Sequence, residues 1–286
     1  ISHEWLLNNV PTDKEILRKW LKCGFIFNGE LFPTEEGTPQ GGIISPTLAN
    51  MALDGLQSLL EHCIRKYKKN YKTIVSKIHL VRYADDFIVT AKDRETIETV
   101  ILPLVRNFMA ERGLTLSEEK TKITHISEGF DFLGFNIRKF PNNTLLTQPS
   151  DDAKKRFCDK IRKVIESNKT VKQRSLIKML NPIIMGWGNY YKYGTSAETF
   201  HRVDWEIHRK LWQWARRRHS NKSKGWVKDK YFKTVNGRKW RFVADMEERS
   251  KMRQITLAYL PDIHHEKFAK VRHYANPYDP ADKSYY

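Results

Sequence analysis

Two adjacent carboxylates, Asp85 and Asp86, lie between two short apolar segments at residues 78–83 and 87–91. Apolar segments separated by so few residues predict a tight β-hairpin with the acidic pair at its tip. Carboxylate oxygens are hard ligands that suit Mg²⁺, which takes one or two of them and completes its shell with water and phosphate oxygens. Asp is also favoured in ordinary turns, where it bonds to the local backbone. The hairpin alone therefore supports a metal site and a structural turn equally.

A glycine-rich loop precedes the hairpin, with the sequence Gly-Thr-Pro-Gln-Gly-Gly-Ile-Ile-Ser-Pro at residues 37–46. Its adjacent glycines let the backbone approach a ligand closely. Ser45 and Pro46 are typical of an N-cap and a first helical position, and a helix N-terminus offers free N–H groups to an anion. Such loops are common by themselves. Placed before an acidic hairpin, the loop favours a ligand-binding role.

Helical and strand-like patterns alternate around these two motifs in the first half of the chain. Helical periodicity covers residues 13–21, about 46–63 and about 94–112, and the last of these ends at Gly113. The second helix carries Gly55 on its apolar stripe and ends in a basic, aromatic tail at residues 65–71. Strand-like segments lie at residues 25–31, 122–126 and 130–138, besides the hairpin. The alternation predicts an α+β fold in which helices pack on an antiparallel sheet.

Turn residues at 141–143 and 148–150 indicate a domain boundary, and the pattern beyond them is helical and basic. We expect helices at about residues 152–167, 171–193 and 197–219, followed by a tail of weak periodicity. Residues 1–150 hold 19 Lys and Arg against 18 Asp and Glu, whereas residues 151–286 hold 32 against 15. A basic half with many aromatic residues is typical of a nucleic-acid-binding surface. Solubility and an anionic membrane surface are the alternatives.

The bulk composition narrows the class of protein. A chain of 286 residues with 40% hydrophobic residues is long enough for two folded domains. The three cysteines, Cys23, Cys63 and Cys158, are scattered and odd in number, which argues against a disulfide framework or a zinc knuckle. No apolar run approaches the roughly 20 residues that cross a bilayer. We therefore expect a reducing compartment and no membrane partner.

The order of the motifs resembles reverse transcriptases of the group II intron maturase type. The loop at residues 37–46 resembles the family's Pro-Gln-Gly loop, and Tyr83-Ala84-Asp85-Asp86 resembles its metal-binding turn. Residues 116–122 and 130–135 resemble the two motifs that follow, and residues 186–191 with 211–219 resemble the maturase thumb, called domain X. The resemblance implies a partial right-hand polymerase palm, an antiparallel sheet with helices, followed by a helical thumb and a basic tail.

The resemblance also implies a role for each matched residue. Asp85 and Asp86 would be catalytic and would bind Mg²⁺, with two ions in the intact enzyme. Nucleotide binding is implied for Pro39, Gln40, Gly41 and Lys120. Primer binding is implied for Tyr83, Phe132, Leu133 and Gly134.

The thumb segment carries two further sets of candidate residues. A basic cluster is a candidate for nucleic-acid binding, although a solvated helix end would have the same composition. Its members are Arg216, Arg217, Arg218, Lys222 and Lys224. Aromatic side chains at helical spacing favour core packing over base stacking. They are Trp187, Tyr190, Tyr191, Trp212 and Trp214.

The same resemblance divides the chain into three parts. We expect a palm at residues 1–148, incomplete at its N-terminus, a thumb or domain X at 149–225, and a basic segment at 226–286 that begins a DNA-binding region. The family's first metal-binding aspartate precedes an Ile-Ser-His segment, and this chain begins at Ile1, so we expect that aspartate and the fingers to be absent. Residues 275–280 resemble the junction before an HNH endonuclease, and we expect none in the chain.

The implied function is that of an RNA-directed DNA polymerase of a group II intron, which also binds intron RNA to assist splicing and mobility. The implied partners are group II intron RNA, an RNA template with a DNA primer, dNTPs and a DNA target, in the bacterial cytoplasm or an organelle. The chain as given is expected to extend primers little or not at all. A non-catalytic maturase that binds RNA, or a CRISPR-associated relative, is the alternative. The Gly-Trp-Gly-Asn-Tyr-Tyr thumb argues against a retron enzyme.

Overall fold

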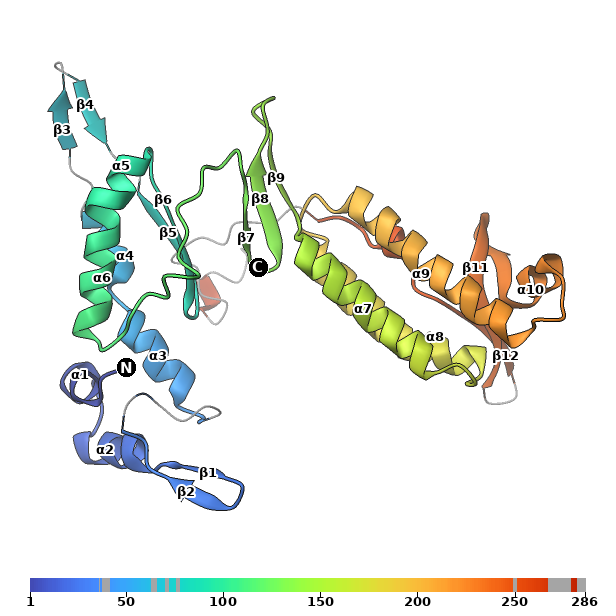
Figure 1. Ribbon diagram of the computed structural model, residues 1–286, viewed down its shortest axis with the longest axis horizontal. Coiled ribbons are helices and arrows are strands. Elements are labelled where there is room, and N and C mark those ends of the chain that lie inside the picture. The colour runs from blue at the N-terminus through green and yellow to red at the C-terminus, as the bar shows by residue number, and fades with distance from the viewer. Residues whose placement is uncertain are drawn as a thin grey trace. The chain divides into compact units, whose positions relative to one another are not determined.

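The chain forms two compact units, Ile1–Ile123 and Thr124–Tyr286, shown as a computed structural model in Figure 1. The structure describes residues 1–35, 37, 42–62, 66–69, 72–75, 78–248, 251–266 and 279–281. In these residues helices alternate with small antiparallel sheets. The predicted α+β class is therefore confirmed.

The first unit opens with two capped helices. The Ser2 hydroxyl accepts a hydrogen bond from Trp5 N–H at the start of α1 (His3–Asn9), and Asp13 caps α2 (Lys14–Lys22) in the same way. Strands β1 (Phe25–Phe27) and β2 (Glu30–Phe32) pair as a hairpin. The third helix, α3 (Ser45–Leu53), begins at Ser45 itself. Its N-cap is therefore Ile44, one residue before the expected cap Ser45. The three helices share a small core of Leu6, Val10, Leu17, Leu21 and Leu48.

The single helix expected at residues 46–63 is wrong, because the chain breaks after α3. Asp54 is extended and Gly55 has a φ of 86°, a left-handed conformation that glycine adopts at little cost. A separate helix, α4 (Leu56–His62), then follows. The basic residues expected to end the helix instead form a hairpin of β3 (Lys66–Lys69) and β4 (Lys72–Val75). Residues 63–65 and 70–71 lie outside the described residues.

A second core of the first unit supports the acidic hairpin. Strands β5 (His79–Tyr83) and β6 (Asp86–Thr90) pair antiparallel. Behind them run α5 (Arg94–Thr96), a π-helical turn η1 (Ile97–Ile101) and α6 (Leu102–Glu111), which together replace the one helix expected at 94–112. The π turn precedes Pro103, which has no backbone N–H and so cannot donate an α-helical hydrogen bond. This core is built from Leu53, Leu56, Leu60, Ile78, Ile101, Val105, Phe108 and Met109.

The second unit begins with a three-stranded antiparallel sheet. Its strands are β7 (Phe130–Phe132), β8 (Phe135–Lys139) and β9 (Leu145–Pro149), with β8 in the centre. Residues 122–126, expected as a strand, form none. The two-residue turn between β7 and β8 has positive φ at both positions, 48° at Leu133 and 79° at Gly134. Two positive φ values match the right-handed twist of a hairpin.

Three long helices follow the sheet, close to the predicted ranges. They are α7 (Asp151–Ser167), α8 (Gln173–Tyr191) and α9 (Ala197–Arg218), and α7 packs on both of the others (Figure 1). The bundle is completed by α10 (Lys224–Tyr231), β10 (Phe232–Val235), β11 (Arg238–Glu248), β12 (Lys251–Thr256) and the short helix η2 (Leu260–Asp262). One core runs from Ala153 to Ile263, so residues beyond 225 share the interior of the three helices.

The aromatic side chains of the bundle lie mostly in this core. Tyr191 and Trp214 are buried, and Trp187 stacks on Phe157 with ring centroids 4.5 Å apart. Tyr190 is half exposed, but its hydroxyl is bonded within the unit. Core packing is therefore the dominant role of this set, as predicted.

Two glycines of α8 are expected to respond oppositely to replacement by Ala. Gly186 is exposed, and a Cβ added there would meet no neighbouring atom within 4 Å, so Gly186→Ala should stabilise the helix by about 0.5–1 kcal/mol. A Cβ at the buried Gly188 would overlap Ile263 Cδ1 and lie 2.9 Å from Leu260 Cδ2, so Gly188→Ala should destabilise by about 1–3 kcal/mol. Urea unfolding of both variants measures the difference. Stabilisation by Gly188→Ala would contradict the tight seating of η2 on α8.

Candidate active site and nucleic-acid surface

The acidic hairpin closes through a two-residue turn. Tyr83 pairs with Asp86 in the β5–β6 register, which leaves Ala84 and Asp85 as the turn. Ala84 has a φ of 52°, an unusual value for a residue with a Cβ. Asp85 and Asp86 are both exposed. The prediction of a tight hairpin with two carboxylates at its tip is confirmed.

The two carboxylates fit a Mg²⁺ ion by their chemistry. In the described part of the chain, neither is held in an ion pair, so their oxygens are open to a ligand. Among the same residues no group of three or more His, Cys, Asp or Glu side chains gathers that could hold a metal ion. Mg²⁺ commonly binds through one or two carboxylates and takes its other ligands from water and substrate phosphates. The pair suits this mode of binding.

The contacts of Arg82, a cation beside the turn, could not be predicted from the sequence. Arg82, in β5, directs Nη1 to the carbonyl oxygen of Ala84 and to Oδ1 of Asn50 in α3, at 2.9 Å in each case. The available signal was a single Arg within an apolar strand, directly before the Tyr-Ala-Asp-Asp motif. The contact to Asn50 spans 32 positions in sequence, which spacing rules do not reach.

The residues predicted to bind the nucleotide are only partly described. Pro39, Gln40 and Gly41 lie outside the described residues. Lys120 is exposed on a turn whose backbone bonds to Ser117. No hydrogen bond or ion pair between described residues joins Lys120 to the acidic hairpin, and its nucleotide role stays a prediction.

The turn predicted to contact the primer is held by helix α8 and by Ser150, the N-cap of α7. The Tyr190 hydroxyl donates to the carbonyl oxygen of Leu133 at 2.8 Å, and Ser150 N–H donates to Gly134 O at 2.8 Å. A Cβ on Gly134 would lie 2.5 Å from Tyr191 Oη, so only glycine fits there. Leu133 and Gly134 thus pack against the thumb-like motif, and Phe132 directly precedes them in β7. Tyr83 belongs to the first unit, where it is largely exposed.

A basic groove of about 460 Å³ lies between the C-terminal ends of α7 and α9. We call it the basic groove; its cations are Arg162, Lys169, Lys210, Arg217 and Arg218. Its walls also include the carboxylate of Glu166 and the indole of Trp214. Five cations around one hollow suit a phosphate chain.

The predicted basic cluster divides into two groups. Arg216, Arg217, Lys222 and Lys224 are exposed and available to a ligand. Arg218 has an internal role, since its guanidinium donates to the carbonyl oxygens of Lys169 and Val171 and lies over the Trp214 ring. Nucleic-acid binding by any of these residues stays a prediction, and Arg218 also holds the α7–α8 loop.

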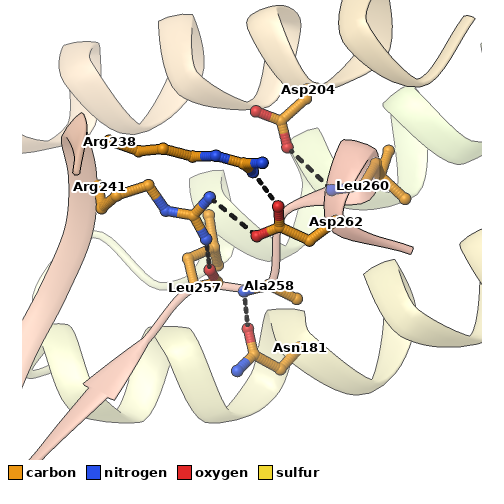
Figure 2. A network of polar contacts seen from close by, with 8 residues as sticks. All are labelled: Asn181, Asp204, Arg238, Arg241, Leu257, Ala258, Leu260 and Asp262. Atoms are coloured by element: carbon orange, nitrogen blue, oxygen red, sulfur yellow. Dashed lines mark hydrogen bonds and ion pairs between the residues drawn. The ribbon is translucent and has the colours of Figure 1, made fainter. Parts of the chain in front are cut away.

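A polar network fastens the segment after β12 to the helices (Figure 2). Asn181 of α8 accepts from Ala258 N–H and donates to Thr256 O, and Arg241 donates to Leu257 O. Asp262 is paired with both Arg238 and Arg241. From α9, Asp204 accepts a hydrogen bond from Leu260 N–H at 3.4 Å. The network and the apolar contacts of Leu260 and Ile263 hold this segment in place.

Burial raises the pKa of Asp204 to about 6, despite the Leu260 N–H and the nearby Arg241 guanidinium. The charged form is thus disfavoured in the folded chain but not in the unfolded chain, whose carboxyl titrates near 3.8. The contribution of Asp204 to the free energy of unfolding is therefore fully present below the unfolded pKa and is lost as the pH rises through about 6.

Asp204→Asn should therefore stabilise the second unit at pH 7–8 by about 1–2 kcal/mol, because the amide keeps an acceptor oxygen without a buried charge. Near pH 4 the difference from the unchanged protein should vanish. Thermal unfolding between pH 4 and 8 measures it, with Asp229→Asn on the exposed face of α10 as control. A pH-independent effect, or destabilisation at pH 8, would contradict the burial argument.

No described helix is both long and apolar enough to cross a membrane. The first 137 residues, which contain the acidic hairpin, match the family model for reverse transcriptase (RNA-dependent DNA polymerase). This match assigns residues 1–137 to the reverse transcriptase family. Residues 154–232 match the model for the group II intron, maturase-specific domain. Together the two matches confirm the predicted family: the chain belongs to the reverse transcriptase/maturase proteins of group II introns.

Three similar curated proteins include two whose names refer to introns. The group II intron-encoded protein LtrA of Lactococcus lactis subsp. cremoris is 28% identical over 56% of this chain and 37% of its own length. An uncharacterized 91 kDa protein in the cob intron of Schizosaccharomyces pombe is 27% identical over 63% of this chain and 30% of its own. Protein YkfC of Escherichia coli (strain K12) is 29% identical over 43% and 38%. The chain thus spans about a third of the length of these relatives.

Proposed function

We propose that the protein carrying this chain copies RNA into DNA and binds the RNA of a group II intron. The observation that carries the catalytic half is the exposed Asp85–Asp86 pair on its two-residue turn, within a segment that matches reverse transcriptases. The family match over residues 154–232 and the basic groove support the RNA-binding half.

Asp85 and Asp86 would hold Mg²⁺, two ions in the intact enzyme. Bound there, Mg²⁺ would neutralise charge on the triphosphate and help to activate the 3′-hydroxyl of the primer for attack. The chain's own contribution is to present two adjacent carboxylates at one exposed tip. Pro39, Gln40, Gly41 and Lys120 would receive the dNTP, and Phe132, Leu133, Gly134 and Tyr83 would contact the primer end.

The remaining partners follow from the same family. An RNA template with its DNA primer would pass the proposed palm, residues 1–148. The intron RNA would contact the basic groove and the exposed cations of the proposed thumb, residues 149–225. We assign the basic segment 226–286 to the DNA target, although residues as far as Ile263 share the core of the thumb helices.

The test is extension of a DNA primer on an RNA template by the protein carrying this chain, with dNTPs and Mg²⁺. Synthesis that needs both the RNA template and Mg²⁺ supports the proposal. Failure to copy RNA under conditions in which the same preparation binds the primer–template would overturn the catalytic half.

A second candidate function is that of a non-catalytic splicing cofactor. It is favoured by the charge of residues 151–286, which hold 32 Lys and Arg against 15 Asp and Glu. Binding to the folded intron RNA, with splicing restored at low Mg²⁺, would support this role. Equal affinity for the intron and for a random RNA of the same length would contradict it.

A further inference from the structure

We propose that Arg82 is a positioning residue for the candidate metal site; this inference rests on the proposed function. Arg82 Nη1 donates to Ala84 O and to Asn50 Oδ1, each at 2.9 Å. The first bond fixes the carbonyl of the peptide that leads into Asp85. The second ties the same guanidinium to helix α3. Arg82 therefore connects the acidic turn to a helix that lies outside the hairpin.

The turn needs such a support because little else holds it. Ala84, Asp85 and Asp86 are all exposed, so packing does not fix them. Ala84 also has a positive φ of 52°, which is disfavoured for a residue with a Cβ. No other side chain of the described residues hydrogen-bonds to these three residues. Without the Arg82 bond, only the pairing of Tyr83 with Asp86 holds the peptide before Asp85, and the position of the carboxylates is less well fixed.

Helix α3 is a firm anchor for the other end of the contact. Leu48, two residues before Asn50, is buried in the core shared with α1 and α2. Leu53, three residues after it, is buried in the core beneath the hairpin. Helix α3 also follows the glycine-rich loop proposed to receive the dNTP. The Arg82 contact thus ties the metal turn to the helix that follows the nucleotide loop.

Electrostatics and positioning predict effects of opposite sign. A cation beside two carboxylates repels a metal ion, so removal of its charge by itself would tighten metal binding. Loss of the positioning bonds would weaken metal binding, because the peptide that leads into Asp85 would be less well fixed. Arg82→Lys separates these effects further. Lys keeps the charge but lacks the planar fork that serves two acceptors from fixed directions.

The experiment measures Mn²⁺ binding to the chain by electron paramagnetic resonance, without any catalytic assay. The variants are Arg82→Lys, Arg82→Ala, Asn50→Ala and the doubly substituted Asp85→Asn/Asp86→Asn, with Lys92→Ala as a control for charge on an exposed residue of the same unit. We expect both Arg82 variants to weaken Mn²⁺ binding by about tenfold or more. We expect Asn50→Ala to weaken it less, and Lys92→Ala to leave it unchanged or slightly tighter. Adding Asn50→Ala to Arg82→Ala should bring no further loss, because the two residues act through one contact.

Melting temperatures establish that each variant is folded. If Arg82→Ala does not fold, Arg82→Lys and Asn50→Ala decide the question. Mn²⁺ binding to folded Arg82→Lys as tight as to the unchanged chain would overturn the inference and leave the proposed metal site intact. Equal Mn²⁺ binding by the unchanged chain and Asp85→Asn/Asp86→Asn would instead overturn the metal site itself, and the role of Arg82 with it.

Discussion

Asp85→Asn is expected to lower primer extension by about 10³-fold in the protein that carries this chain. Asn keeps the size and one oxygen of the side chain but loses the charge that holds Mg²⁺. A metal ion at a transferring phosphoryl group contributes several kcal/mol of charge stabilisation, and each 1.36 kcal/mol is a factor of ten in rate. Asp86→Asn should have an effect of similar size. Single-nucleotide incorporation under saturating primer–template measures both.

The matched control for this prediction is Asp54→Asn. Asp54 is exposed at the C-terminal end of α3, in the same unit, and has no side-chain hydrogen bond or ion pair to the described residues of the hairpin, so its replacement should change the rate less than twofold. Primer–template affinity should be unchanged in all three variants, because the carboxylates are not expected to bind the nucleic acid. Full activity in Asp85→Asn would refute the metal role of the turn.

Removal of four cations from the basic groove is expected to weaken RNA binding by about 10²-fold at physiological salt. The variant replaces Arg162, Lys169, Lys210 and Arg217 by Gln. Arg218 is left in place because it bonds to the carbonyl oxygens of Lys169 and Val171, so its loss would disturb the fold. If all four contact phosphates, the slope of log affinity against log salt should become shallower by roughly 3.

The control variant removes the same charge from the first unit, through Gln at Lys19, Lys22, Lys92 and Arg94, which are all exposed. A purely nonspecific effect of net charge would weaken binding equally in both variants. Filter binding of a structured intron RNA across a salt series distinguishes them. An unchanged salt slope in the groove variant would show that the groove does not hold RNA.

The sequence predicts the acidic hairpin because two short apolar segments and the short connection between them are local signals. The long helices of the second unit follow for the same reason, since their apolar spacing extends over many turns. The break at Gly55 was missed because a glycine on an apolar stripe also suits close helix packing, and the positive φ that ends α3 is not encoded in periodicity. The π turn before α6 has no periodic signature either.

Contacts between distant residues account for most of what the sequence could not predict in the site. The Arg82–Asn50 bond joins a strand to a helix 32 positions away. Tyr190 was predicted as a packing residue, and its bond to Leu133, 57 positions away, gives it a second role at the turn of β7 and β8. Arg218 was grouped with its neighbours by charge, although its side chain is used within the fold.

The segment from Leu257 to Ile263 has a consequence for how such proteins are assembled from parts. It carries Leu257, Leu260 and Ile263 into the core beside α8 and α9. If a recombined segment ended with α10, the apolar faces of α8 and α9 would be uncovered. Asn181 and Asp204 would also lose the backbone N–H groups of Ala258 and Leu260 to which they are hydrogen-bonded. The three-helix bundle is therefore not a module that recombination can move alone. The smallest exchangeable part of this unit includes the strands β10–β12 and the segment that follows them.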